Sequence, residues 1–352
     1  MARAMQRRAI AKSVAVVIIV VILIIAGVAA YYFVSTPSSQ TQNTTLMLDF
    51  TQTGYHALFY YGLANGVYSR AGINLTILAG SGSGNTVAAV AAGKIDFGFA
   101  DTGTLAVAAA TQNVSNVRVI AMVFQNTPGA IIYNKANISS PKDLNGKTMG
   151  TFQGNGQQKM FSVFANLNGI NASSVTPTYV APSAFNQLVA LGKVAFVPST
   201  INQMANIGPI AAQNNIQLGV FTYPAYGVNV YGAAIITNTN MLNSHPDLVK
   251  KFVQATMQSV LGAVQHPQAA ISGLVQYNPQ LNSTKALQDF ELIVTNCLPQ
   301  NVNSTSNALT LGWVDQSKMQ NTINLVSQAY GISTPPAATN LFTDQYVQAP
   351  AS

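Results

Sequence analysis

Residues 46–78 read LMLDFTQTGYHALFYYGLANGVYSRAGINLTIL, and this stretch decides the fold class. Short apolar runs at 46–50 and 73–78 predict two strands. Between them, residues 56–65 predict a helix that ends at Gly66, because glycine readily adopts the left-handed conformation that follows a helix. A strand, a helix and a second strand in close succession predict an α/β protein with a mostly parallel sheet.

The same alternation continues outward from this stretch. Further strands are predicted at 95–100, 117–124, 130–133, 147–151, 175–180, 194–198, 217–223 and 231–237, and helices at 86–92, 104–111, 156–168, 183–191 and through most of 246–330. A chain of 352 residues usually divides into more than one domain. We therefore expect two α/β lobes around a cleft, with residues 46–125 plus 222–345 in the first lobe and 126–221 in the second. The last two predicted strands are candidates for the return to the first lobe.

The N-terminal region predicts a membrane segment. Residues 14–34 carry no charged side chain and are long and apolar enough for a helix across a bilayer. Basic residues precede them, which predicts a cytoplasmic tail at 1–12 and an exported body. We expect 13–34 to be a single-pass anchor in the cell membrane, followed by a polar linker at 35–45. A cleaved signal peptide is the alternative, and both place the body outside the cytoplasm.

Composition excludes several classes of protein. Charged residues make up only 7% of the chain, and beyond the N-terminal tail no basic cluster larger than Lys250–Lys251 remains. Nucleic-acid binding requires a concentrated basic face and is not expected. The single cysteine, Cys297, lies in an apolar stretch, so it should be buried and cannot form an internal disulfide. No histidine pair has metal-ligand spacing, and neither a metal nor a cofactor is predicted.

Polar and glycine-rich segments follow the predicted strands, where open α/β sheets bind their ligands. We predict a small-molecule site formed by Asp49, Thr51, Gln52, His56, Ser81, Ser83, Asn85, Asp101, Thr102, Gln125, Gln153, Asn155, Ser199 and Tyr226. His56 should hydrogen-bond a polar ligand atom, although backbone at a helix start could satisfy it instead. The Asp49 carboxylate is expected to accept a hydrogen bond either from an N–H group of the ligand or from a backbone N–H at the strand end. Asp101 precedes Thr-Gly-Thr and is expected to cap a helix, with ligand contact as a second role.

Four strings carry a resemblance to a known family. They are residues 48–77, 93–103 (GKIDFGFADTG), 140–150 (SPKDLNGKTMG) and Gly154-Asn-Gly156 before a long helix. Their order and spacing resemble the thiamine-pyrimidine-precursor binding proteins, relatives of the nitrate/sulfonate/taurine (NitT/TauT) binding proteins, over residues 46–260. The resemblance implies a type II periplasmic-binding-protein fold and a role as the capture component of an ABC-type importer, with permease and ATPase subunits as partners.

The chain departs from the family at two places. Residues 192–196 (GKVAF) lack the family's acid, and Gln52-Thr53 stand where the family has Pro-Asn, so the ligand is left open. A thiamine pyrimidine precursor is favoured, and a small anion such as nitrate, a sulfonate or taurine is the alternative. Few cations are placed to hold an anion, since Lys159 lies in a predicted helix and Arg118 in a predicted strand.

An enzyme is the alternative from a different class. The chain shows no nucleophile elbow and no paired acids with a histidine. The family's eukaryotic pyrimidine synthase, which consumes its own histidine, also carries a cysteine cluster, and this chain has one cysteine. We therefore expect a binding protein with no catalytic residues.

Overall fold

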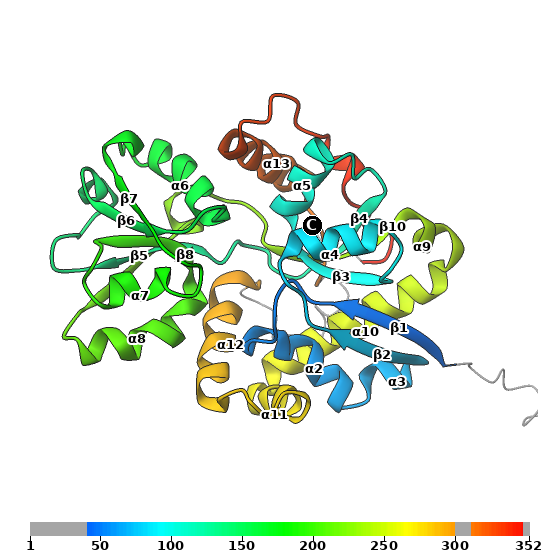
Figure 1. Cartoon of the computed structure of the whole chain (residues 1–352). Coiled ribbons are helices and arrows are strands. Elements are labelled where there is room, and N and C mark those ends of the chain that lie inside the picture. The colour runs from blue at the N-terminus through cyan, green and yellow to red at the C-terminus, as the bar shows by residue number, and fades with distance from the viewer. Residues whose placement is uncertain (1–40, 300–310, 348–352) are drawn as a thin grey trace, which may run out of the picture. The chain divides into compact units, whose positions relative to one another are not determined.

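The computed structural model describes residues 41–299 and 311–347 (Figure 1). Residues from Gln42 onward form one compact unit, which contains two five-stranded sheets. We call the first sheet and its helices lobe 1, and the second sheet and its helices lobe 2. The expected α/β architecture with two sheets is thus confirmed.

The sheet of lobe 1 has the strand order β2-β1-β3-β10-β4. β1 pairs in parallel with β2 and β3, whereas β10 is antiparallel to both β3 and β4. β3 and β10, in the middle of this sheet, are buried along almost their whole length, which agrees with their apolar residues at 97–100 and 233–236. The strands are β1 (Gln42–Met47), β2 (Ile73–Leu78), β3 (Phe97–Asp101), β4 (Val117–Met122) and β10 (Ala233–Asn238).

The sheet of lobe 2 repeats this plan with the order β7-β6-β8-β5-β9. β6 is parallel to β7 and β8, and β5 is antiparallel to β8 and β9. The sequence does not distinguish β9 from β10, but only β10 returns to the first sheet. The strands are β5 (Gly129–Asn134), β6 (Thr148–Thr151), β7 (Thr176–Tyr179), β8 (Phe196–Thr200) and β9 (Leu218–Thr222).

Each sheet contains one strand that runs antiparallel to both of its neighbours, β10 in lobe 1 and β5 in lobe 2. In both cases the chain has just arrived from the other lobe, from β9 or from β4, without a crossover α-helix on the way. These two passages, residues 123–128 and 223–232, connect the lobes, and we refer to them together as the hinge.

Helices cover both sheets. Lobe 1 carries α2 (Ala57–Ala64), α3 (Val67–Arg70), α4 (Ser83–Ala91), α5 (Thr102–Thr111), α9 (Thr239–Ser244), α10 (Pro246–Gln265) and α11 (Pro267–Tyr277), and lobe 2 carries α6 (Gly156–Leu167), α7 (Phe185–Ala190) and α8 (Met204–Gln213). α10 and α11 each begin with proline, which suits the first helical position because its missing N–H would be unpaired there. α10 packs onto the sheet through Phe252, whose ring stacks on Phe97 at 3.8 Å between centroids.

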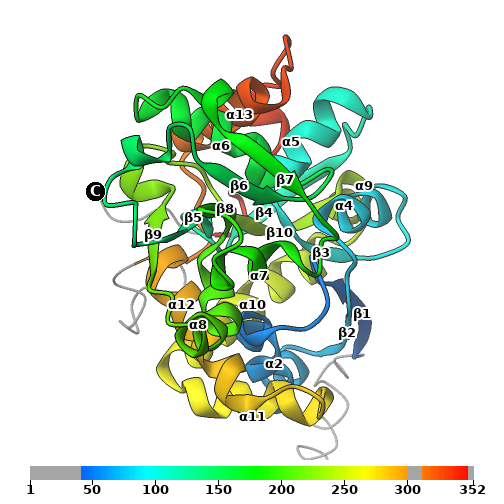
Figure 2. The ribbon, with the colours of Figure 1, turned by 60° about the vertical axis from the view of Figure 1, so that its left-hand side comes forward.

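Two further helices contact both lobes (Figures 1 and 2). α12 (Ser283–Cys297) packs on the 3₁₀ turn η1 (Gly54–His56) of lobe 1 and on α8 of lobe 2. α13 (Gln316–Tyr330) lies against α5 and α6. α13 is also tied to both hinge passages, since Lys318 Nζ donates to Asn126 Oδ1 at 3.0 Å and Thr322 Oγ1 accepts from the Tyr231 N–H at 2.9 Å.

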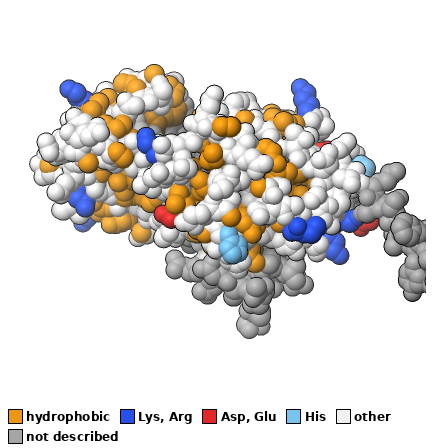
Figure 3. Space-filling view, turned by 90° about the horizontal axis from the view of Figure 1, so that it is seen from below, with side chains coloured by type: hydrophobic (Ala, Val, Ile, Leu, Met, Phe, Trp, Pro, Cys, Tyr) orange, Lys and Arg blue, Asp and Glu red, His pale blue; other side chains and the backbone are white. Residues whose placement is uncertain are grey.

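Within the described ranges, no helix has the length and apolarity needed to cross a membrane. The predicted anchor at 13–34, its basic tail and most of its linker lie outside these ranges. On the face drawn in Figure 3, charged side chains are few and separated by uncharged ones.

Candidate ligand-binding cleft

A cleft of about 460 Å³ is lined by residues of both lobes and of the hinge. Two carboxylates face it from lobe 1, Asp49 and Asp101. None of the described residues that line it is a lysine, arginine or histidine. Aromatic rings form much of its wall: Phe50, Tyr55, Phe124, Phe152, Phe185, Tyr231 and Tyr330. The cleft is therefore acidic and aromatic, and its volume falls in the range of small-molecule sites.

Asp49 is held in place from two sides. Its backbone lies in the loop after β1, where the Asp49 and Phe50 carbonyls accept from the N–H groups of Gly82 and Gly80 at 2.8 and 3.0 Å. A Cβ at position 80 would overlap the Leu48 carbonyl oxygen, so only glycine permits the two loops to approach this closely. The side chain accepts a hydrogen bond from His56 Nε2 on Oδ1 at 2.8 Å and lies 3.2–3.3 Å from the Tyr55 hydroxyl.

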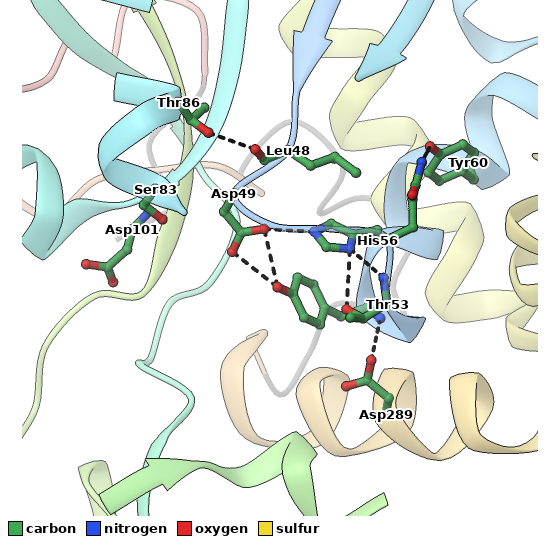
Figure 4. Close-up of polar contacts among 11 residues, drawn as sticks. Leu48, Asp49, Thr53, His56, Tyr60, Ser83, Thr86, Asp101 and Asp289 are labelled. Carbon is green, nitrogen blue, oxygen red and sulfur yellow. Dashed lines mark hydrogen bonds and ion pairs between the residues drawn. The ribbon is translucent and has the colours of Figure 1, made fainter. Parts of the chain in front are cut away.

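His56 lies behind Asp49 and outside the lining of the cleft (Figure 4). Its side chain is fully buried. Nδ1 accepts the backbone N–H of Thr53 at 3.0 Å, while Nε2 faces Asp49. Both ring nitrogens therefore have protein partners, and the predicted direct contact with a ligand remains untested.

Asp101 caps a helix, as its sequence context predicts. Its Oδ1 accepts from the backbone N–H and the hydroxyl of Thr104 at 2.8 and 3.0 Å, at the start of α5. Its own N–H donates to Ser83 Oγ at 3.0 Å, which joins the starts of α4 and α5. Burial raises the pKa of Asp101, and the nearby negative charge of Asp49 raises it further. Two carboxylates thus share the cleft without a cation among the described lining residues.

A third carboxylate, Asp289, lies behind the cleft on α12. It accepts the Tyr55 backbone N–H on Oδ2 at 3.3 Å, and its other oxygen has no hydrogen-bond partner among the described residues. Burial raises its pKa. Asp289 therefore supports the turn that carries Tyr55 and His56, and it does not line the cleft.

Aromatic side chains on the two lobes face the cleft differently. Phe152 and Phe185 of lobe 2 pack edge-to-face at 4.9 Å between ring centroids. The side chain of Phe50 in lobe 1 is 53% exposed, although its backbone carbonyl accepts a hydrogen bond from the Gly80 N–H. Sequence reasoning missed all three residues. A signal was present for two of them, since Phe50 is the last residue of one predicted strand and Phe152 directly follows another.

Five of the predicted site residues line the cleft: Asp49, Ser83, Asp101, Asn155 and Ser199. Asn155 also caps α6, because its Oδ1 accepts from the Gln157 N–H at 2.9 Å.

The other predicted residues have different surroundings. Thr102 is buried and donates to the Gly232 carbonyl, Gln125 donates to the Trp313 carbonyl, and Gln52 donates to the Tyr60 hydroxyl. Asn85 donates to Ser81 Oγ, Tyr226 packs on Phe164 and Phe221, and Gln153 lines a separate depression of about 300 Å³. Thr51 is exposed and outside the lining of the cleft.

No cluster of histidine, cysteine, aspartate or glutamate suited to a metal ion occurs within residues 41–299 and 311–347. Cys297 is buried, as predicted, and burial raises the pKa of its thiol. A buried thiol that resists ionisation is a poor nucleophile, so Cys297 has a packing role.

The model of the protein family described as NMT1/THI5 like matches residues 53–270. The riboflavin-binding protein RibY of Chloroflexus aurantiacus is 25% identical over 318 residues, which cover 87% of this chain and 86% of that protein. The 4-amino-5-hydroxymethyl-2-methylpyrimidine phosphate synthase of Legionella pneumophila is 23% identical, over 74% of this chain and 81% of that protein.

Among solved structures, the periplasmic aliphatic sulphonate binding protein SsuA of Escherichia coli superposes with a TM-score of 0.65 at 12% identity. The superposition covers 88% of this chain and 95% of that one. The two-lobed α/β arrangement is therefore the periplasmic-binding-protein fold. At this identity the likeness concerns the fold alone.

Proposed function

The chain belongs to the NMT1/THI5 like family, and on that basis we propose that it is the extracytoplasmic solute-binding component of an ABC-type importer. It captures a small molecule between its lobes and presents it to permease and ATPase subunits. The proposal is supported by the fold, by a cleft lined from both lobes and by a hinge of two chain passages.

The favoured ligand is a planar, nitrogen-rich ring such as a thiamine pyrimidine precursor. The observation that carries this proposal is the acidic and aromatic character of the cleft. Asp101 Oδ2 and part of Asp49 remain available as acceptors, so a ligand with N–H donors fits better than one rich in acceptors. Aromatic walls favour a flat ligand, because ring faces stack well on one another.

Phe50 is proposed as the ring that stacks on the ligand from lobe 1. An exposed phenylalanine on a pinned loop is costly in water, and a ligand ring would cover it. Phe152 and Phe185 would cover the opposite face when the lobes close.

The alternative of a small anion has less support. Nitrate or a sulfonate would face two carboxylates without a cation among the described lining residues, which opposes binding by like-charge repulsion. Riboflavin is a second candidate, favoured by the similarity to RibY and by a cleft larger than a single pyrimidine requires. We propose binding without turnover, although some relatives are named as pyrimidine phosphate synthases.

A thermal-shift series on the purified full-length protein in detergent tests these proposals. The panel contains 4-amino-5-hydroxymethyl-2-methylpyrimidine, thiamine, riboflavin, taurine, an alkanesulfonate and nitrate. A ligand at 100 times its Kd stabilises by about 2.7 kcal/mol, which raises the midpoint by several degrees. A shift with amino-pyrimidines supports the favoured ligand, and one with riboflavin alone supports the second candidate. A shift with anions alone, or a change in ligand mass after incubation, contradicts the proposal.

We also propose that residues 13–34 hold the protein at the cell membrane with its N-terminus in the cytoplasm. The apolar segment and the basic residues before it support this arrangement. Intact mass of the protein extracted from membranes tests it. A mass that includes residue 1 agrees with an anchor, and a mature protein that starts after residue 30 indicates cleavage instead.

A further inference from the structure

We infer that His56 is a positioning residue that fixes the carboxylate of Asp49, and that it is held as the neutral tautomer with its proton on Nε2. The inference rests on the proposed function only in assuming that Asp49 contacts the ligand. It assigns to His56 a role different from the direct contact expected from the sequence.

The tautomer follows from the donors around the ring. The Thr53 backbone N–H points at Nδ1 at 3.0 Å, and a backbone N–H can only donate. Nδ1 must therefore carry a lone pair. The proton is then on Nε2, which donates to Asp49 Oδ1 at 2.8 Å. An imidazolium would set its Nδ1–H against the Thr53 N–H and lose that hydrogen bond, leaving only the Thr53 hydroxyl, 3.3 Å away, to accept from Nδ1.

The ring cannot turn to reach a ligand. It is fully buried, packs against Tyr55 at 4.1 Å between centroids and meets Phe99 edge-on at 6.2 Å. The turn that carries it is secured by the bond from the Tyr55 N–H to Asp289. His56 can therefore act on a ligand only through Asp49.

This arrangement prepares Asp49 before a ligand arrives. One oxygen of the carboxylate is held by His56, and the Tyr55 hydroxyl lies close to both oxygens, so the side chain has little freedom left to lose on binding. A preorganised acceptor binds more tightly than one that must first be ordered. His56 thereby contributes to affinity for N–H donors without touching them.

The tautomer is tested on the ligand-free protein. Labelling with ¹⁵N-histidine gives three pairs of ring resonances, for His56, His245 and His266, and substitutions His245→Gln and His266→Gln assign them. We expect His56 at neutral pH to show an unprotonated Nδ1 and a protonated Nε2. A proton on Nδ1, or an imidazolium, overturns the inference whatever the ligand is.

The positioning role is tested by binding of 4-amino-5-hydroxymethyl-2-methylpyrimidine. We expect His56→Leu to weaken binding about tenfold, and His56→Gln, whose amide can still donate to Asp49, to stay within about threefold of the wild type. Asp49→Ala should weaken binding at least as much, and in that background His56→Leu should cause no further loss. His266→Leu is the control, since His266 stacks on Tyr61, lies outside the lining of the cleft and should leave the Kd unchanged.

The outcomes separate the two proposals. If the wild type fails to bind the probe, the favoured ligand is wrong. The inference about His56 is then tested without ligand, by the tautomer measurement and by whether the effects of His56→Leu and Asp49→Ala on the free energy of unfolding are coupled. If the wild type binds and the losses from His56→Leu and Asp49→Ala simply add, His56 does not act through Asp49 and the inference is wrong.

Discussion

Asp49 and Phe50, two neighbouring residues after β1, have different roles in the proposed site. The side chain of Asp49 is surrounded by the donors of His56 and Tyr55, whereas the ring of Phe50 is 53% exposed. The loop backbone holds both in place. The proposed site thus offers a fixed hydrogen-bond acceptor beside an uncovered aromatic face.

Phe50→Ala should weaken binding of a ring ligand about tenfold, because a stacking surface is lost. It should not lower the unfolding midpoint, since the exposed ring contributes little to the core. Isothermal titration and thermal unfolding measure the two effects. Tyr179→Ala is the control, since its ring is 54% exposed and lies outside the lining of the cleft. Equal loss of affinity in both variants would contradict the role given to Phe50.

Asp101→Asn should be more stable than the wild type at neutral pH in the absence of ligand. Asparagine caps a helix as well as aspartate does, and the substitution removes a carboxylate whose pKa is raised by burial and by Asp49. A raised pKa means that the folded protein binds more protons than the unfolded chain, so ionised Asp101 destabilises the fold.

This advantage of Asp101→Asn should shrink as the pH falls from 7, and it should vanish below the ordinary carboxyl value of 3.8, where Asp101 is protonated in both the folded and the unfolded state. Urea unfolding of both proteins at several pH values measures the difference. If the stability advantage of Asp101→Asn grows as the pH falls, the pKa of Asp101 is not raised in the folded protein. Asp143 provides a contrast, since hydrogen bonds from Ser139 and Ser140 lower its pKa to about 2.

Sequence reasoning located the polar lining of the cleft better than its aromatic lining. Asp49, Ser83 and Asp101 were identified because polar residues at strand ends are conspicuous. Tyr55 and Tyr330 were missed because aromatic residues in helical surroundings usually belong to a core. The surroundings of His56 depend on the Thr53 N–H and on the fold of the loop, and neither is visible in residue types.

At the scale of elements, the local pattern of apolar and polar residues predicts most helix and strand boundaries closely. The strand at 73–78 has the bounds predicted for β2, but β1 begins at Gln42 where Leu46 was expected. Residues 42–45 are polar, yet they pair in register with β2, and Thr44 is buried by the sheet. The antiparallel placement of β5 and β10 could not be read from the sequence, because it depends on which sheet the chain joins after each passage.

β5 starts with a glycine that has no room for a side chain. A Cβ on Gly129 would lie 2.5 Å from the ring of Tyr223 and 2.7 Å from Gln157 Oε1. Gly129→Ala should therefore lower the free energy of unfolding by about 1–3 kcal/mol through overpacking beside the hinge. Chemical denaturation measures this loss.

Gly84→Ala is the matched control in α4, where an added Cβ would lie no closer than 4.0 Å to the Thr104 side chain. Alanine is favoured over glycine inside a helix, so this change should stabilise by about 0.5–1 kcal/mol. If both substitutions change the free energy of unfolding in the same direction, the packing described around Gly129 is contradicted.

At the scale of the whole molecule, the lobes are joined by more than their hinge. α12 and α13 each pack on both lobes, and Val326 of α13 is buried in the core of lobe 2. Separate melting of one lobe would strip these helices of part of their packing. The described unit should therefore behave as one cooperative structure.

Scanning calorimetry of the ligand-free protein should show a single unfolding transition for the two lobes. A bound ligand should move that transition as a whole, because the cleft is lined from both lobes. Two transitions, of which only one responds to ligand, would indicate that the lobes unfold independently and that α12 and α13 couple them weakly.

The position of β10 between β3 and β4 also sets an order of assembly on the ribosome. β3 and β4 are both synthesised early, but the strand that joins them emerges only after all of β5–β9. The sheet of lobe 2 is complete in sequence at that moment, whereas the sheet of lobe 1 still has a gap in its middle. The sheet that is translated second can thus pair all its strands first, and the nascent N-terminal strands keep an open edge until residues 233–238 arrive.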